Sequence, residues 1–280
     1  MRLKVRHETV YRYEEPASYS IQYVRLTPPS NAAQRVLRWR LSTPGRVREH
    51  VDAFGNPMHV VVVDRPHSEI RIGVTGEVES HDTDGVWPDD GEPHPPALFL
   101  RSTPLTASDP ALLDFAGGFA ERIAANAAGG LEAMMQAIRS HVCYVQGATH
   151  VGTTAAGAWQ SGAGVCQDHA HVFTACCRAL GVPARYVSGY LFTDGQHDEM
   201  ASHAWVEAWV DGVGWLGHDV TNGLRAGRQH VRLAAGLDYL DASPIRGMRR
   251  GGGSERMVVR VFVTDGQPAS AIDQQQQQQQ

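Results

Sequence analysis

Hydrophobic and polar positions alternate along the first part of the chain. Four runs alternate in this way or are rich in β-branched residues, and they read LKVRHETVYRY, RVLRWRLST, HVVVVD and EIRIGVTGEVE. The segments TPPSN, DAFGNP and DRPHS, which have the composition of turns, separate these runs. A period of two with turns at short intervals is typical of strands with one buried face. Residues 1–82 therefore predict a small all-β domain, a sandwich or a barrel.

The pattern changes after this β-rich part. Residues 83–99 are acidic and rich in proline and glycine, and we interpret them as a linker. Three helices are expected after it, in SDPALLDFAGGFAERIA, GGLEAMMQAIRSHVCYV and GVCQDHAHVFTACCRALGVP. The first begins with Pro110 behind a serine and an aspartate that can cap it, and the third ends at Gly181.

Strands follow the helices. The runs ARYVSGYLF, ASHAWVEAWV, GWLGHDVT and ERMVVRVFVTD are all strand-like. Helices followed by an antiparallel run of strands indicate an α+β fold, and we place this second domain at residues 100–265. Residues 266–280 end in a run of glutamines, and we interpret them as a flexible, low-complexity tail.

Composition limits the class of protein. A chain of 280 residues is long enough for two domains, and a formal net charge of −5 gives no general attraction to nucleic acid or to an anionic membrane. The N-terminus lacks the apolar region of a signal peptide, and no run reaches the roughly 18 apolar residues of a membrane span. The four cysteines include no CxxC pair, and the 14 histidines follow no metal-ligand spacing. We therefore expect a cytoplasmic protein with free thiols and with neither a metal nor a cofactor.

The cysteines occupy two kinds of position. Residues 166, 170, 173, 177 and 180 are spaced so that they share one face of the third helix. We interpret Cys177, and with it Cys176 and Cys143, as small hydrophobic residues of the core. Cys166 differs because it stands in the first turn, where free N–H groups and the positive end of the helix dipole stabilise a thiolate. Cys166 is therefore a candidate nucleophile.

A thiolate nucleophile needs a base, and the base needs a group that orients it. In the segment SHAWVEAWVDGVGWLGHDVTNG, His203 begins an alternating strand and Asp219 ends the next one. A two-residue turn would put their side chains on opposite faces of this hairpin, whereas an odd-length loop or a bulge puts them on the same face. We therefore predict an irregular turn, for which Gly212 and Gly214 are suited. The alternatives are a strand histidine bound to a backbone carbonyl and an aspartate that only shapes a turn.

Long segments of the chain resemble a known family. GVCQDHAHVFTACCRALGVPARYVSGYL, ASHAWVEAWVDGVGWLGHDVTNG and GATHVGTTA closely resemble the core of bacterial transglutaminase-like proteins, which share the papain-like fold of cysteine peptidases. HETVYRYEEPA and RLTPP resemble the β-rich domain that often precedes this core. The resemblance implies that Cys166 is the nucleophile, His203 the base and Asp219 its orienting residue. Two positions depart from the family pattern, since His169 replaces an aromatic residue and Val220 replaces a proline.

The resemblance also implies a reaction, which is acyl transfer without a cofactor. Cys166 would attack a carboxamide of a peptide or protein, and an amine or water would then release the acyl group from the thioester. The alternatives are a cysteine peptidase or amidase with the same three residues, and a binding module that keeps the fold without catalysis. The expected partner is a peptide or protein substrate.

Some neighbouring residues belong to the expected site. The resemblance makes Gln160 a candidate for binding the oxyanion, and an exposed loop amide is the alternative. Trp205 shares a strand face with His203 and is expected either to cover the imidazole or to pack in the core. Asp168, in the first helical turn, is interpreted as a capping or a substrate-positioning residue. His169 and His171 are two residues apart on a helix and face different directions, so they do not predict a metal site.

Overall fold

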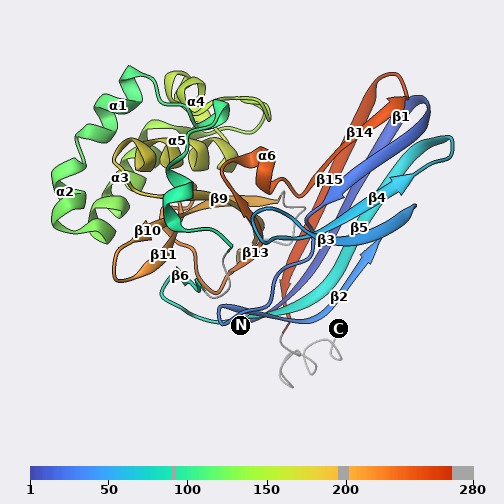
Figure 1. Cartoon of the computed structure of the whole chain (residues 1–280), viewed down its shortest axis with the longest axis horizontal. Coiled ribbons are helices and arrows are strands. Elements are labelled where there is room, and N and C mark those ends of the chain that lie inside the picture. The colour runs from blue at the N-terminus through green and yellow to red at the C-terminus, as the bar shows by residue number, and fades with distance from the viewer. Residues whose placement is uncertain (90–92, 195–201, 267–280) are drawn as a thin grey trace, which may run out of the picture.

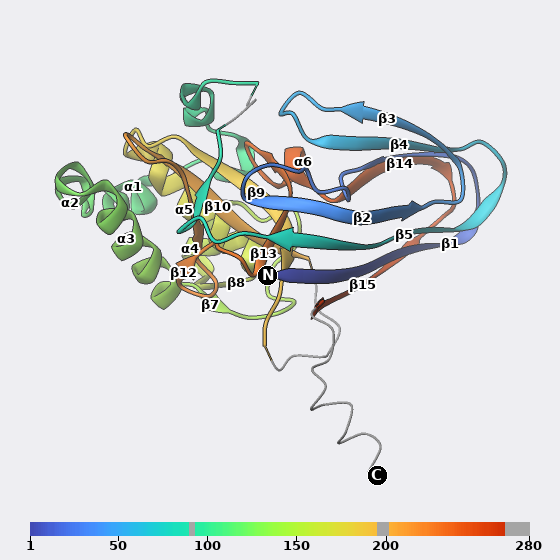
Figure 2. The same cartoon turned by 90° about the horizontal axis from the view of Figure 1, so that it is seen from below.

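The computed structural model describes residues 1–89, 93–194 and 202–266. Helices α1 to α5 gather at one end of the molecule, and the long strands β1, β14 and β15 lie at the other (Figures 1 and 2). The fold is α+β, as the sequence predicted, with two large antiparallel sheets and one parallel pair of two-residue strands. The strands of the first sheet are β1 (Arg2–Val24), β2 (Gln34–Ser42), β3 (Arg46–Val51), β4 (Pro57–Val63), β5 (His67–Ser80), β14 (Ile245–Gly251) and β15 (Glu255–Asp265).

The remaining elements form the second domain. Its strands are β6 (Val86–Trp87), β7 (Cys143–Tyr144), β8 (Ala163–Gly164), β9 (Ala184–Leu191), β10 (His203–Val210), β11 (Gly214–Asp219), β12 (Leu224–Arg225) and β13 (His230–Gly236). Its helices are η1 (Pro96–Leu100), η2 (Pro104–Thr106), α1 (Pro110–Gly117), α2 (Ala120–Ala125), α3 (Ala127–His141), α4 (Ala155–Ser161), α5 (Cys166–Ala179) and α6 (Tyr239–Ala242). Within the described residues, no helix is both long and apolar enough to cross a membrane.

The first sheet is built around β1, which is 23 residues long. The first half of β1 pairs with β5 and β15, and its second half pairs with β4 and β14. The change of partners falls near Pro16, which has no N–H to give to a ladder. Alternate residues of these strands face one hydrophobic core, which includes Leu3, Val24, Ile72 and Val261. The predicted β-rich N-terminal domain is confirmed.

The last two strands belong to this first sheet and not to the second domain. β14 and β15 come from the C-terminal part of the chain, yet they run beside the N-terminal strand β1, as the red and blue ribbons of Figure 1 show. The expectation that the second domain extends to residue 265 is therefore wrong for residues 245–265. The strand Glu255–Asp265 does lie where the pattern put it. Alternation predicts that a strand forms, but it does not tell which sheet the strand joins.

The second sheet has the order β12-β11-β10-β9-β13, with β6 also paired to β11. Helix α5 packs against β9 and β10. All its residues from Asp168 to Arg178 are buried, so the helix is covered on every side rather than along one stripe. Cys176 and Cys177 are completely buried, as expected. The helix that begins with the candidate nucleophile is thus the centre of the domain.

Three local expectations for this domain need correction. Cys143 is exposed and not a core residue, because Val142 points into the core and the next residue of the extended chain points outward. The first expected helix is split into α1 and α2 by Gly117 and Gly118. The expected linker contains β6, so part of it is an edge strand of the second sheet.

The β-rich domain is attached to the outer edge of β13 by two amide side chains. The Gln34 amide donates to the carbonyl oxygen of Arg232 and accepts from its N–H, both at 2.9 Å. The Asn56 amide makes the same pair of bonds with Ala235, both at 2.8 Å. Each amide thus satisfies backbone groups that a neighbouring strand would otherwise bind.

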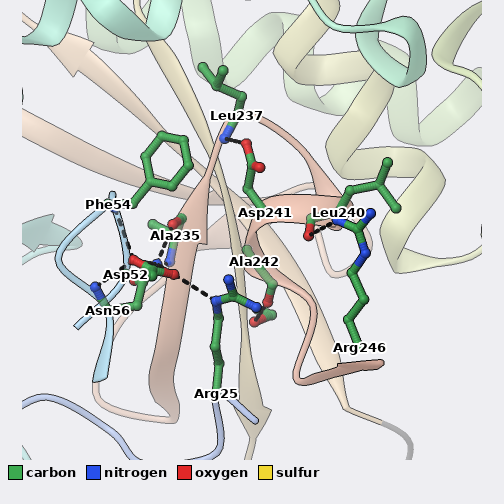
Figure 3. A network of polar contacts seen from close by, with 11 residues as sticks. Arg25, Asp52, Phe54, Asn56, Ala235, Leu237, Leu240, Asp241, Ala242 and Arg246 are labelled. Atoms are coloured by element: carbon green, nitrogen blue, oxygen red, sulfur yellow. Dashed lines mark hydrogen bonds and ion pairs between the residues drawn. The ribbon is translucent and has the colours of Figure 1, made fainter. Parts of the chain in front are cut away.

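Asp52 holds the second of these amides in place. Its Oδ1 accepts from the backbone N–H of Phe54 and of Asn56, and its Oδ2 accepts from Arg25 at 2.6 Å (Figure 3). All these residues belong to the β-rich domain, so contacts within that domain hold the loop between β3 and β4 in the shape that meets β13. The attachment fixes the strand that begins at His230.

Candidate active site

Cys166 is the first residue of α5, and it is half-buried. The chain enters the helix from β8 through Val165, whose backbone is extended. The buried Asp168 shapes this entry, because its Oδ2 accepts from the N–H of Val165 at 2.8 Å and from the hydroxyl of Thr149 at 2.6 Å. Asp168 therefore caps the turn, which is one of the two roles expected for it.

Cys166 stands among the first backbone N–H groups of an α-helix. The first N–H groups of an α-helix have no partner within the helix, and the helix dipole places positive potential there. The same N–H groups can stabilise an oxyanion that forms on a bound carbonyl. The Sγ atom lies 4.0 Å from the carbonyl oxygen of Ser202, the residue directly before His203. The start of α5 and the start of β10 therefore meet.

His203 begins β10 and Asp219 ends β11, and their side chains are hydrogen-bonded with 2.8 Å between Nε2 and Oδ2. The two strands pair in a register that puts Val210 opposite Gly214 around a three-residue loop. Gly212 and Gly214 have φ values of 77° and 108°, which side chains disfavour. The predicted irregular turn is confirmed, and it gives the two side chains a common face.

The neighbours of His203 keep its ring in the charged form. Burial opposes this charge, but the hydrogen bond with Asp219 and the neighbouring thiol of Cys166, together with the charges of both groups, raise the pKa of His203 to about 10. Because Nε2 is bound to Asp219, Nδ1 is the ring nitrogen left for Cys166. Burial also opposes the charge of Asp219, yet its hydrogen bonds with His203 and His230 hold its pKa well below the ordinary value. A thiol, an imidazole and a carboxylate are thus joined in one chain of contacts.

Asp219 also shapes the turn that follows it. Its Oδ1 accepts from the N–H of Asn222 at 3.2 Å, and its Oδ2 accepts from the amide of the same residue at 2.8 Å. The turn role, which the sequence offered as an alternative, therefore exists together with the contact to His203. Val220, which replaces the proline of the family pattern, is buried in the core of the second domain.

Trp205 and Gln160 have different surroundings. The buried indole of Trp205 lies against the imidazole of His203, with ring centroids 6.3 Å apart and planes at 28°. This position agrees with both interpretations of Trp205, covering the ring and packing in the core. Gln160 is exposed, and its amide donates to Asp109, the N-cap of α1, at 2.9 Å. That contact matches the alternative of an exposed amide, and it gives an oxyanion role for Gln160 no support.

His169 connects the two elements that carry the nucleophile and the carboxylate. Its Nδ1 is 2.9 Å from the hydroxyl oxygen of Thr221, and its Nε2 is 2.8 Å from the carbonyl oxygen of Val142. Burial lowers the pKa of His169, so the neutral ring is favoured. The histidine that replaces the usual aromatic residue therefore ties α5 to the turn after β11.

One group of side chains in the described part of the chain has possible metal-ligating atoms close together. These atoms belong to His203, Asp219 and His230, and they lie within 4.8 Å of one another. Each Nε2 is 2.8 or 3.0 Å from the same carboxylate oxygen, which is a hydrogen-bond distance. Two ligands of one tetrahedral zinc ion stand roughly 3.3 Å apart when their bonds are about 2.0 Å long. The geometry therefore fits a hydrogen-bonded network better than a metal site.

Sequence analysis missed several residues near Cys166. Burial, and after it the charge of Cys166, raise the pKa of Tyr144, Tyr186 and Tyr239. These residues come from β7, β9 and α6. His230, the second histidine on Asp219, was also missed. No local motif marks these residues, because only the packing of distant elements brings them to the site.

Two family descriptions match parts of this chain. The description "Bacterial transglutaminase-like N-terminal region" matches residues 3–79, and "Transglutaminase-like superfamily" matches residues 117–220. The second range contains Cys166, His203 and Asp219.

Similar sequences and one similar structure cover nearly the whole chain. An uncharacterized protein of Mycobacterium leprae is 32% identical over 277 residues, which are 94% of this chain and 98% of that protein. An uncharacterized protein of Mycobacterium tuberculosis is 30% identical over 284 residues, which are 88% of this chain and 87% of that protein. The crystal structure of a presumed cysteine protease from Cytophaga hutchinsonii has a TM-score of 0.76 at 24% identity, covering 96% of this chain and 92% of its own. That structure has the same fold.

Proposed function

The chain belongs to the bacterial transglutaminase-like family, and we propose that it is a thiol enzyme that transfers acyl groups from peptide or protein carboxamides. The observation that supports this most strongly is the chain of contacts from Cys166 through His203 to Asp219. An imidazole with a pKa of about 10 is protonated at neutral pH, and it can therefore balance a thiolate beside it. We assign Cys166 as the nucleophile, His203 as the acid and base, and Asp219 as the residue that orients His203.

The first half of the proposed reaction forms a thioester. The Cys166 sulfur attacks the carbonyl carbon of a glutamine carboxamide, and the N–H groups at the start of α5 stabilise the oxyanion. The carbon–nitrogen bond then breaks while the proton on His203 moves to the leaving nitrogen. Ammonia departs, and the acyl group is left on sulfur.

The second half releases the acyl group. An amine or a water molecule gives a proton to His203 and attacks the thioester carbon. The carbon–sulfur bond breaks, and the thiolate of Cys166 and the protonated His203 are restored. An amine gives a new amide, whereas water gives a carboxylic acid. The proton that leaves with ammonia is replaced by the one that His203 takes from the amine or water, so the proposed cycle balances without a metal or a cofactor.

A peptidase reaction uses the same residues and is the second candidate. The leaving nitrogen is then part of the peptide backbone, and water completes the cycle. The fold shared with the presumed cysteine protease from Cytophaga hutchinsonii favours this candidate, because that name describes hydrolysis of peptides. Transfer to an amine, hydrolysis of a glutamine carboxamide and cleavage of a peptide bond give different products, and these products can be told apart by mass.

The test is a product analysis with three readable outcomes. The protein is incubated with a panel of glutamine-containing peptides and a fluorescent primary amine, in the presence of a chelator. Mass spectrometry then distinguishes amine incorporation, conversion of glutamine to glutamate, and chain cleavage. Cys166→Ala is expected to abolish every product, and Cys143→Ala is the matched control, because Cys143 is an exposed thiol. Equal turnover by wild type and Cys166→Ala would contradict the proposal.

We further propose that the protein works in the cytoplasm, as its free thiols predict. Fractionation of cells that contain a tagged protein tests this location. Recovery of the tag outside the cytoplasmic fraction would contradict it.

A further inference from the structure

We propose that His230 is a positioning residue of this site, which holds the carboxylate of Asp219 in the orientation that His203 requires. This role rests on the proposed function, because it has meaning only if His203 acts on Cys166. Neither the resemblance nor the motifs single out this histidine, which begins β13, a strand beyond the 117–220 match.

The contact between His230 and Asp219 is direct and buried. Their Nε2 and Oδ2 atoms are 3.0 Å apart, and the side chains are 4% and 0% exposed. His203 uses the same oxygen, so the two imidazoles approach one carboxylate with their ring centroids 6.1 Å apart. A carboxylate with two ring donors and the Asn222 amide on one oxygen cannot rotate without losing several bonds.

A backbone group fixes the tautomer of His230. The N–H of Gly227 donates to Nδ1 of His230 at 3.1 Å. A backbone N–H can only donate, so this Nδ1 carries no proton. The proton of the neutral ring must then be on Nε2, where it points at Asp219. His230 is thus a neutral donor, and it binds the carboxylate without cancelling the negative charge that His203 needs.

The surroundings of His230 keep the ring in place. The indole of Trp205 meets the His230 ring edge to face, with centroids 5.1 Å apart. Two residues further along β13, the Gln34 amide binds both the N–H and the carbonyl oxygen of Arg232. His230 lines a small cavity together with Glu207 and Arg232, which pair with each other at 3.2 Å. The β-rich domain therefore supports the strand that carries the second imidazole.

Three substitutions separate the donor at Nε2 from the rest of the ring. A glutamine side chain at this position would place an amide N–H near the position of Nε2, whereas an asparagine is too short to reach Asp219 and keeps only an acceptor for Gly227. We therefore compare His230→Gln, His230→Asn and His230→Phe, of which the last keeps only the shape. The measured quantity is the rate at which iodoacetamide alkylates Cys166 at pH 6.5, with His203→Ala as the lower limit.

The expected results follow from the lost hydrogen bond. His230→Asn and His230→Phe are expected to slow alkylation of Cys166 about 10- to 100-fold, because a hydrogen bond to a charged group is lost. His230→Gln is expected to stay within about threefold of wild type. Equal loss in His230→Gln and His230→Asn would overturn the role, since packing alone would then explain it. Wild-type rates in His230→Asn would overturn it as well.

A measurement on the wild type covers the case in which these variants do not fold. In protein with ¹⁵N-labelled histidine, NMR is expected to show His230 with its proton on Nε2 and none on Nδ1. A proton on Nδ1 would overturn the assignment. Failure of the proposed function has a different signature, because Cys166 of the wild type would then alkylate no faster than the exposed Cys143.

Discussion

Gly189 is the position at which a single added methyl group tests the packing behind the site. It lies in β9, opposite His203 of β10. A Cβ atom at this position would stand 2.2 Å from the carbonyl oxygen of Val231 and 2.6 Å from Cη2 of Trp205. Both distances are far below the roughly 3.5–4.0 Å of optimal contact. Gly189→Ala therefore forces either the backbone or the indole to move.

The size of the effect follows from how little these neighbours can yield. The carbonyl belongs to the ladder between β9 and β13, and the indole is enclosed by His203 and His230. Overpacking of this kind costs about 1–3 kcal/mol, and we expect the upper end because one of the contacts is with backbone. For a chain of this size, about 3 kcal/mol lowers Tm by roughly 6–12 °C. A displacement of His203 by about 1 Å would slow the reaction roughly 100-fold.

Two assays measure these effects on the same samples. Thermal unfolding followed by circular dichroism gives the change in Tm, and alkylation of Cys166 gives the state of the site. Gly117→Ala is the control, since a Cβ at Gly117 meets nothing within 4 Å. Trp205→Phe is expected to recover part of the loss in Gly189→Ala by making room for the methyl group. A Gly189→Ala variant with the wild-type Tm and alkylation rate would refute this description of the packing.

Three further predictions concern other parts of the molecule. Asn56→Leu is expected to lower the free energy of unfolding by about 2–3 kcal/mol in urea, because it leaves the N–H and carbonyl of Ala235 buried without their amide partner; an unchanged midpoint would contradict the attachment. Burial lowers the pKa of His171 and His218 to about 4, so their contribution to stability is present above pH 6.5 and lost as the pH falls towards 4. Between pH 7 and pH 5 the free energy of unfolding should fall by roughly 2 kcal/mol for each histidine, and Gln replacements should remove that slope. Asp219→Asn is expected to slow turnover about 10³- to 10⁴-fold with little change in substrate binding, and a purely structural aspartate would instead change Tm alone.

Local rules were sufficient where neighbours in sequence decide the structure. The N-cap at Asp109 with Pro110 behind it, and the end of α5 before Gly181, lie where capping chemistry put them. The hairpin of β10 and β11 is a stronger case, because the parity of its residues predicted an irregular turn. That turn gives His203 and Asp219 their common face. The sequence alone therefore predicts the contact of these two side chains.

Other features depend on packing between distant segments, which no local pattern records. The sequences of β14 and β15 have the pattern of ordinary strands and do not tell which sheet they join. They pair with β1 because its 23 residues are long enough to take one of them along each half. Cys143 lies in a short strand at the surface, where burial depends on which neighbour points inward. His230 follows Asp219 by 11 residues and reaches it only because β13 lies beside β9.

In the proposed enzyme, the imidazolium of His203 and the thiolate of Cys166 form an ion pair at the start of α5. The most direct measurement is the alkylation of Cys166 by iodoacetamide at pH 6, compared in the same chain with the exposed Cys143. Mass spectrometry of peptides reads both sites at once, so Cys143 serves as an internal reference. We predict that Cys166 reacts at least tenfold faster than Cys143 in the wild type, and that His203→Ala removes this advantage. Equal rates at the two cysteines in the wild type would contradict the account.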